Sequence, residues 1–324
     1  MNNETFQYEI IEAAQELGIA FVEDTNGEKN VGFTLGQATI KAGVRDSTAM
    51  AFLVPAKKRP NLHVVKNAMV LNVIIDDDGE VRGVRMNLRG RRELKAYATK
   101  EVILSAGSIN TPQLLMLSGI GPAEHLQKMG IPVIQDLQVG KNLQDHPGVL
   151  IAMKIDESTA DSYTQDDLMD DFFAYLKDHS AKVTKEGDLL LPVLMFLTEE
   201  SRGEILLRSS DPYDKPRIYP NYLATDFDVQ SFVRAIRLLL KFLTTKAFKR
   251  HDAKLIILPI PECDALEFNS DVYWACYTKY LTTTIYHPVG TAKMGPDSDP
   301  DAVVDSRLRV KGVRGLGIQM LQQL

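Results

Sequence analysis

One histidine stands in a context that suits acid–base chemistry. His287 lies in the segment YHPVGT (286–291), directly before Pro288. Proline disfavours the α conformation of the residue before it, so we expect the imidazole on an extended turn that follows a helix. Loops held by a scaffold often carry catalytic groups, and a neutral imidazole can accept a proton near pH 7. His287 is therefore a candidate catalytic residue, although a lone histidine is more often structural or simply exposed. The other histidines are weaker candidates: His63, His125, His146, His179 and His251.

A second candidate segment is SAGSINTPQLLMLSGIGP, residues 105–122. An apolar strand over 102–104 runs into small residues, among them Ala106 and Gly107, and a helix follows. We expect Thr111 to cap that helix and Pro112 to occupy its first position. Small side chains at such a junction let a flat cofactor or a pyrophosphate approach the backbone, and a helix N-terminus favours negative charge. Tight packing of the strand against the helix would explain the same small residues.

Several common catalytic motifs are missing from the sequence. It contains no GxGxxG, GxxxxGK[ST], HExxH or GxSxG pattern, and it predicts no metal site. Its two cysteines, Cys263 and Cys276, rule out a disulfide framework and lack the spacing of a structural zinc site. A cysteine hydrolase pairing Cys276 with His287 is a third possibility, but no sequence feature orients that pair.

Composition favours small-molecule chemistry over nucleic-acid or membrane binding. The 324 residues carry 37 basic and 43 acidic side chains, a net charge of −6, which would not attract a polyanion. No run of about 18 apolar residues predicts a membrane span. The amino-terminal residues show no signal-peptide pattern, and the localisation stays open. The length corresponds to about two domains.

The elements that must position the candidate residues mix helices with antiparallel strands. A helix is predicted over 5–17, and a second begins after Asp46 or Ser47 and ends at Pro55. Apolar runs from residue 62 to 97 predict strands joined by hairpins, and 205–207 and 217–222 predict further strands. More helices are predicted over 122–130, from Thr225 or Asp226 onward and around 273–280, and the acidic segment 156–178 predicts a solvated helix face.

The sequence resembles the FAD-dependent glucose-methanol-choline (GMC) oxidoreductase family, and in particular its insect glucose-dehydrogenase-like branch. Five segments carry the resemblance: GVRDSTAMAFL (43–53), RPNLHVV (59–65), EVILSAGSINTPQLLMLSGIGPAEHL (101–126), IPVIQDLQVGKNLQDHP (131–147) and YHPVGTAKMGPDSDPDAVVDSRLRVKGVRGL (286–316).

This resemblance implies an α+β fold, in which an incomplete FAD-binding Rossmann-like part is interleaved with an antiparallel-sheet substrate domain covered by helices. Residues 1–150 would form a partial FAD-binding domain, 151–280 the substrate-binding domain, and 281–324 a partial return to the FAD-binding domain that carries His287.

It also implies FAD-dependent oxidation of the CH–OH group of an alcohol or sugar. Hydride would pass to the flavin N5 while His287 takes the hydroxyl proton, and oxygen or a quinone would then accept the electrons. FAD contacts would fall at Val70, Ala106 and Gly107.

The sequence departs from the family pattern at both ends. The glycine-rich turn that holds the FAD pyrophosphate and the second active-site residue near the carboxyl terminus have no counterpart here. Charged hydrogen bonds contribute about 1.5–3 kcal/mol each, so losing two or three phosphate contacts would weaken FAD binding by about 3–9 kcal/mol. We therefore expect a truncated chain with weak FAD binding, and the alternative function is a non-catalytic binding or interaction remnant without FAD.

Overall fold

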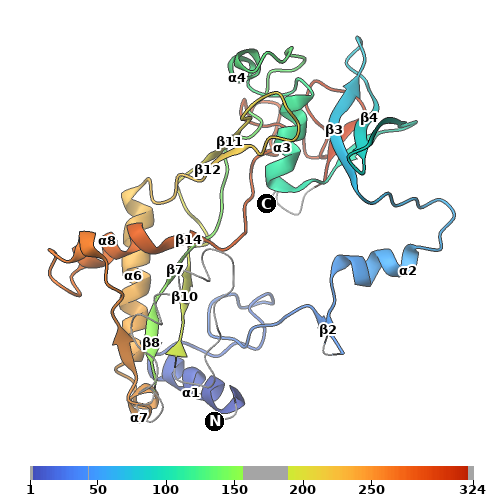
Figure 1. Ribbon diagram of the computed structural model, residues 1–324. Helices are drawn as coiled ribbons and strands as arrows, with labels where there is room; N and C mark the ends of the chain where they lie inside the picture. Colours follow the sequence, from blue (N-terminus) through green and yellow to red (C-terminus); the bar gives the residue numbers. More distant parts are fainter. Residues whose placement is uncertain (1–2, 43, 156–188, 320–324) are drawn as a thin grey trace. The chain divides into compact units, whose positions relative to one another are not determined.

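Two structural units share the chain, which passes repeatedly from one to the other. The computed structural model describes residues 3–42, 44–155 and 189–319 (Figure 1). The first unit is built from Met1–Leu62, Gly148–Met195 and Val229–Thr283, and the second from His63–Pro147, Phe196–Asp228 and Thr284–Leu324. The acidic segment 156–178 lies outside the described residues, and the predicted functional ranges 1–150, 151–280 and 281–324 stay a prediction.

An antiparallel sheet of three strands opens the second unit. Its strands are β3 (Ala68–Ile75), β4 (Val81–Leu88) and β5 (Arg92–Tyr97), joined in sequence order. The turn between β3 and β4 is closed by Asp76, whose carboxylate accepts hydrogen bonds from the backbone N–H groups of Asp78 and Glu80. The predicted hairpins are confirmed.

The apolar run at 62–65 forms no strand, contrary to our expectation. Val64 and Val65 are 53% and 61% exposed and lie in an irregular segment that leads into β3. Their β-branched side chains suit a strand, but a strand also needs a hydrogen-bonding neighbour, which this segment lacks among the described residues.

A parallel strand pair and a helix form the core of the second unit. Strand β6 (Val102–Leu104) pairs in parallel with β15 (Leu316–Ile318), and β6 leads into α3 (Gly107–Leu117), which packs on β3 (Figure 1). Leu115 and Met116 of α3 are fully buried within this core. The predicted strand before α3 is confirmed, although Ile103 is 52% exposed and the strand is buried on one face only.

The remaining elements of the second unit follow the predicted order. They are α4 (Ala123–Lys128), which ends before Gly130 as expected, and the antiparallel strands β11 (Glu204–Leu206) and β12 (Arg217–Tyr219).

In the first unit, α1 (Asn3–Glu16) packs against α7 (Lys246–Arg250). The Glu16 carboxylate accepts hydrogen bonds from the backbone N–H groups of Lys246 and Ala247, at 2.8 and 3.0 Å, so a side chain of α1 caps the N-terminus of α7. The Arg250 guanidinium pairs with Glu9 and Glu12 of α1. Gly18, with φ of +77°, follows the end of α1 as predicted.

The apolar residues of helix α6 (Asp226–Phe242) recur at helical spacing because they form its buried face. Val229, Phe232, Val233 and Ile236 are buried, at positions i, i+3, i+4 and i+7. The Thr225 hydroxyl accepts from the backbone N–H of Asp228, which confirms one of the two predicted caps.

Helix α8 (Asp271–Leu281) begins after Ser270, whose hydroxyl accepts from the backbone N–H of Tyr273. Its Trp274 side chain is 2% exposed. The first unit also holds short strands and helices: β1 (Ile40–Lys41), β2 (Val44–Arg45), β7 (Pro147–Leu150), β8 (Ala152–Lys154), β9 (Leu189–Leu190), β10 (Val193–Met195), β13 (Lys254–Ile256), β14 (Thr282–Thr284), which ends in the second unit, and the 3-10 turn η3 (Pro261–Cys263).

Two expectations for the first unit are wrong. The helix after Ser47 does not end at Pro55: a π-helical stretch η1 (Ala49–Leu53) continues into α2 (Val54–Ala56). Pro55 lies in the first turn of α2, directly after η1, so the helical stretch continues through the proline. The two cysteines form a disulfide bond, Cys263–Cys276, which the sequence analysis did not predict and which removes Cys276 as a candidate nucleophile.

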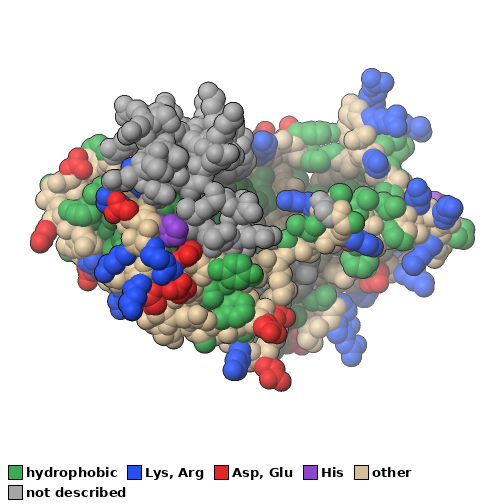
Figure 2. All heavy atoms as spheres, turned by 90° about the horizontal axis from the view of Figure 1, so that it is seen from below, with side chains coloured by type: hydrophobic (Ala, Val, Ile, Leu, Met, Phe, Trp, Pro, Cys, Tyr) green, Lys and Arg blue, Asp and Glu red, His purple; other side chains and the backbone are tan. Residues whose placement is uncertain are grey.

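The surface carries charges of both signs. Figure 2 shows basic, acidic and apolar side chains on one face. Every helix in the part of the chain that the structure describes falls short of the length and apolar character needed to cross a membrane.

Candidate active site

Two histidines that are 141 residues apart in the sequence meet in the second unit. The Nδ1 atoms of His146 and His287 lie 2.9 Å apart, and the ring planes cross at 75°. Both residues precede a proline, which keeps each out of the helical conformation. The backbones run antiparallel here, because the N–H groups of Gln144 and Val289 each donate to the other residue's carbonyl, at 3.0 and 2.8 Å.

A buried carboxylate holds the backbone of both histidines. Oδ1 of Asp145 accepts from the backbone N–H of His146 at 2.8 Å and of His287 at 2.9 Å. Oδ2 accepts from the hydroxyls of Tyr222 and Thr284, the latter at 2.5 Å. Asp145 is 5% exposed, and four donors compensate its carboxyl oxygens for the loss of water.

Two further ionisable groups adjoin Asp145. Oε1 of Glu199 accepts from the backbone N–H of Asp145 at 2.6 Å, whereas its buried Oε2 has no hydrogen-bond partner among the described residues. Burial raises the pKa of Glu199 to about 7, and the nearby Asp145 and Asp228 carboxylates act in the same direction. Burial and the hydrogen bond to Asp145 raise the pKa of Tyr222.

The turn that follows His287 is hydrogen-bonded to the start of α3. The Ser108 hydroxyl donates to the Pro288 carbonyl at 2.6 Å, and the Thr291 hydroxyl donates to the Ser108 carbonyl at 2.6 Å. Gly290 in this turn also lies close to the segment at Asn142, because a Cβ atom on residue 290 would lie 2.4 Å from the Asn142 carbonyl oxygen. The structure therefore brings the candidate base beside the strand-to-helix junction.

Helix α3 begins earlier than the sequence suggested, so Thr111 is not its N-cap and Pro112 is not its first residue. The helix starts at Gly107, and Pro112 lies inside it. A proline at 112 cannot donate to the carbonyl of residue 108, the acceptor four residues back, and the Thr291 hydroxyl supplies that donor instead. Thr111 accepts from the backbone N–H of Ala106 at 3.1 Å, which fixes the turn that enters the helix.

Of the three residues predicted to contact the flavin, Ala106 and Gly107 lie at the strand-to-helix junction and Val70 lies on β3. Ala106 is exposed, and a Cβ atom built on Gly107, whose φ is +83°, would meet no atom within 4 Å, so the backbone at this junction borders open space. Val70 lies on β3, next to a break in the regular pairing with β4. No described hydrogen bond links Val70 to the histidine pair.

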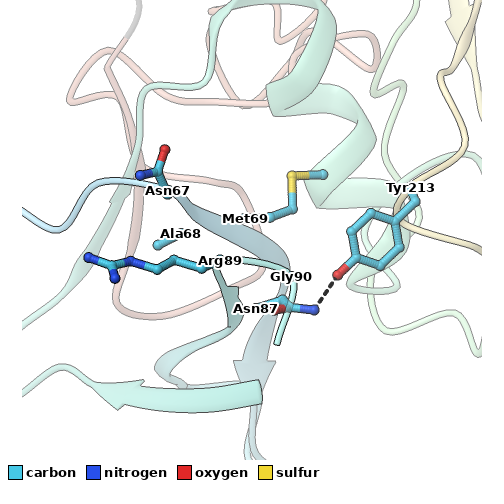
Figure 3. Close-up of a pocket in the computed structure, with 7 residues that line it drawn as sticks. All are labelled: Asn67, Ala68, Met69, Asn87, Arg89, Gly90 and Tyr213. Atoms are coloured by element: carbon cyan, nitrogen blue, oxygen red, sulfur yellow. Dashed lines mark hydrogen bonds between the residues drawn. The ribbon is translucent and has the colours of Figure 1, made fainter. Parts of the chain in front are cut away.

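A cavity of about 440 Å³ adjoins the first residues of β3. Figure 3 shows its lining, in which the Asn87 amide donates to the Tyr213 hydroxyl at 2.7 Å. The residues lining it are Asn67, Ala68, Met69, Asn87, Arg89, Gly90 and Tyr213. Two of them, Ala68 and Met69, directly precede Val70. Over residues 3–42, 44–155 and 189–319, no three His, Cys, Asp or Glu side chains are grouped to hold a metal ion.

The sequence analysis missed the partners of His287. His146 was ranked among the weaker histidines, and Asp145, Glu199 and Tyr222 were not singled out. One available signal was overlooked: of the six histidines, only His146 and His287 are followed by proline.

Comparisons with known proteins agree with the family resemblance. Models of the GMC oxidoreductase family match residues 1–148 and residues 199–318. The chain is 34% identical over 362 residues to a glucose dehydrogenase (FAD, quinone) of Drosophila pseudoobscura pseudoobscura, covering 98% of this chain and 57% of that protein. It is also 34% identical to the mitochondrial choline dehydrogenase of Mus musculus, covering 98% of this chain and 58% of the relative.

Solved structures share the fold. The formate oxidase of Aspergillus oryzae superposes with a TM-score of 0.80 at 25% identity, over 98% of this chain and 66% of the other, which confirms the predicted α+β fold class. The chain thus spans somewhat more than half the length of the curated relatives compared here. It belongs to the GMC oxidoreductase family.

Proposed function

We propose that the protein catalyses the FAD-dependent oxidation of a CH–OH group in an alcohol or sugar, with His287 as general base. The observation that supports this most directly is the pair of hydrogen bonds that join the turn after His287 to the start of α3. These bonds hold the candidate base beside the exposed backbone at Ala106, the junction at which we expect the cofactor.

The residues at this junction fit a flat ring system. Ala106 is exposed, and no atom lies within 4 Å of a Cβ position on Gly107, so the backbone leaves room for a planar group. Ala106 and Gly107 would hold FAD here, and Val70 on β3 would contribute a further contact. FAD, when bound, supplies the acceptor for the hydride at its N5 atom.

His287 would remove the hydroxyl proton of the substrate. Departure of hydride leaves positive character on the carbon, and loss of the hydroxyl proton at the same time avoids a high-energy oxocarbenium ion. The His287 side chain is exposed and can meet a substrate, and a positioned base typically contributes about 10²–10⁴-fold to the rate.

Relatives suggest the substrate class and the electron acceptor. The compared relatives are named for glucose and choline, and the first is also named for quinone. We propose an alcohol or sugar as substrate and oxygen or a quinone as acceptor, with residues 151–280 forming the substrate-binding domain and the ranges 1–150 and 281–324 the FAD-binding part.

Flavin uptake by the purified chain tests this proposal. The chain is mixed with FAD, freed of unbound flavin and examined for absorbance in the flavin bands, and turnover of alcohols and sugars is then measured with a dye acceptor. His287→Ala should lower kcat by about 10²–10⁴-fold with a smaller effect on KM, and FAD uptake should persist. A folded chain that stays colourless would favour the alternative, a non-catalytic binding remnant, and unchanged turnover in the variant would remove His287 from the reaction.

A further inference from the structure

We propose that His146 is a positioning residue that keeps His287 in the tautomer with its proton on Nδ1, which leaves Nε2 free to accept a proton from substrate. This inference rests on the proposed function for its purpose, but the contact on which it depends is independent of that function.

The distance between the two rings leaves room for one proton. The Nδ1 atoms lie 2.9 Å apart, so one imidazole donates and the other accepts. If His287 donates, its Nε2 carries a lone pair and can act as a base. If His146 donates, neutral His287 must carry its proton on Nε2 and cannot accept another there. The direction of this single hydrogen bond therefore decides whether His287 can serve as the base.

The two rings differ in burial, and this difference favours one direction of the hydrogen bond between them once the pair has gained a proton. Burial lowers the pKa of His146, and the neighbouring His287 lowers it further, although Asp145 opposes both effects. The His287 side chain is more exposed than that of His146, so it is the ring of the pair that a substrate can reach more readily. When a substrate proton is added to Nε2 of His287, that ring carries protons on both nitrogens and donates from Nδ1 to His146. If His287 already donates from Nδ1 before it takes up the proton, protonation of its Nε2 atom leaves the hydrogen bond between the two rings unchanged.

Backbone hydrogen bonds hold the two segments that carry the histidines in a fixed alignment. Asp145 accepts from the backbone N–H groups of both histidines, and the reciprocal hydrogen bonds of Gln144 and Val289 align the two segments. Among the described residues, Tyr222 and Thr284 donate to the Asp145 carboxylate, and Glu199 accepts from the Asp145 backbone. None of these contacts involves the Nδ1 atom of either histidine, so within the part of the chain that the structure describes each Nδ1 is hydrogen-bonded to the other ring.

Long-range ¹H–¹⁵N NMR of the histidine rings tests the proposal without any need for turnover. Spectra are recorded on the full chain at about pH 8, where a histidine of reference pKa near 6.5 is neutral. Signals are assigned through single substitutions such as His287→Gln. We expect His287 to show the Nδ1–H pattern. His125 provides an internal reference for that pattern, because its Nε2 accepts from the backbone N–H of Leu207 at 3.0 Å.

Three variants separate positioning from general structural support. His146→Phe keeps an aromatic ring but removes the acceptor, so His287 should lose the Nδ1–H pattern and shift to Nε2–H, the usual major tautomer of a free neutral imidazole. His146→Asn offers an amide oxygen as acceptor and should restore Nδ1–H at least in part. His63→Phe, a histidine replaced in the exposed segment before β3, should leave the His287 signals unchanged.

Each result of the NMR experiment either supports or overturns the proposed tautomer of His287. An Nε2–H pattern for His287 in the unsubstituted chain would overturn the proposal, as would an unchanged Nδ1–H pattern in His146→Phe. If His146→Phe does not fold, the pattern of the unsubstituted chain alone decides. Failure of the proposed function is a separate result, because a chain that shows Nδ1–H at His287 but takes up no FAD keeps the tautomer assignment and loses the oxidation.

Discussion

At the scale of single residues, the candidate site depends on two buried carboxyl groups with different partners. Within the described part of the chain, Asp145 accepts four hydrogen bonds, whereas Glu199 accepts one and its Oε2 has no partner. A carboxylate with several donors is stabilised in its charged form, and a buried carboxyl with few donors favours its neutral form. Glu199, with its single donor, therefore favours its neutral form, and burial raises its pKa to about 7.

Glu199 should make the stability of the second unit depend on pH. Its folded-state pKa of about 7 lies above the ordinary value of 4.5, so its contribution to stability is fully present below pH 4.5 and is lost as the pH rises through 7. Glu199→Gln keeps an acceptor for the Asp145 N–H and cannot ionise. Between these two pH values, the unsubstituted chain should lose roughly 1–3 kcal/mol of unfolding free energy relative to this variant.

Urea unfolding at pH 5 and at pH 8 measures this difference. Glu101→Gln, at an exposed carboxyl, serves as the control and should not change the pH dependence. Parallel pH profiles for Glu199→Gln and the unsubstituted chain would contradict the assignment of a neutral Glu199.

At the scale of elements, α3 depends on a residue far away in the sequence. The carbonyl of Ser108 lacks its usual helical donor because Pro112 has no N–H, and the fully buried Thr291 replaces it. The hydrogen bond from Thr291 to Ser108 therefore links the first turn of α3 to the segment that carries His287. The start of α3 and the position of the candidate base are therefore coupled.

Thr291→Val tests this coupling, since the substitution keeps the side-chain shape and removes the hydroxyl. A buried carbonyl left without a donor costs about 1–3 kcal/mol, so the free energy of unfolding should fall by that amount. Pro112→Ala restores a backbone donor to Ser108, and in that background Thr291→Val should cost less. A double-mutant cycle by urea unfolding measures the difference, and strictly additive effects would show that the two residues do not share this carbonyl.

At the scale of the whole molecule, each unit is assembled from three separated chain segments. The candidate site draws on residues near 106, 145, 199, 222 and 287, all within the second unit. The disulfide Cys263–Cys276 belongs to the first unit and closes a short loop between η3 and α8.

Removing the disulfide should destabilise the first unit. The two cysteines are 13 residues apart, and a loop of that size corresponds to about 3 kcal/mol in the chain-entropy model. The double variant Cys263→Ala/Cys276→Ala should lose about that much unfolding free energy. The single tryptophan, Trp274, lies in α8, so its fluorescence reports urea unfolding of this unit. A transition at the unchanged urea concentration would contradict the expectation, and the unsubstituted chain treated with a reducing agent provides the matched comparison.

The sequence by itself determined the elements whose signals are local. The β3–β5 hairpins, the apolar stripe of α6 and the glycine after α1 were all predicted, because side-chain periodicity and turn residues act over a few positions. His287 was identified from its proline neighbour and from the family resemblance, and its role stays a proposal.

Only the tertiary structure decided which polar groups meet. The first turn of α3, the pairing of His146 with His287 and the four donors on Asp145 each depend on contacts across many residues. A buried donor or acceptor must find a partner, but local sequence does not specify which distant segment provides it. The strand-like residues at 62–65 failed as a prediction for the same reason, because a strand requires a neighbour that a local pattern cannot supply.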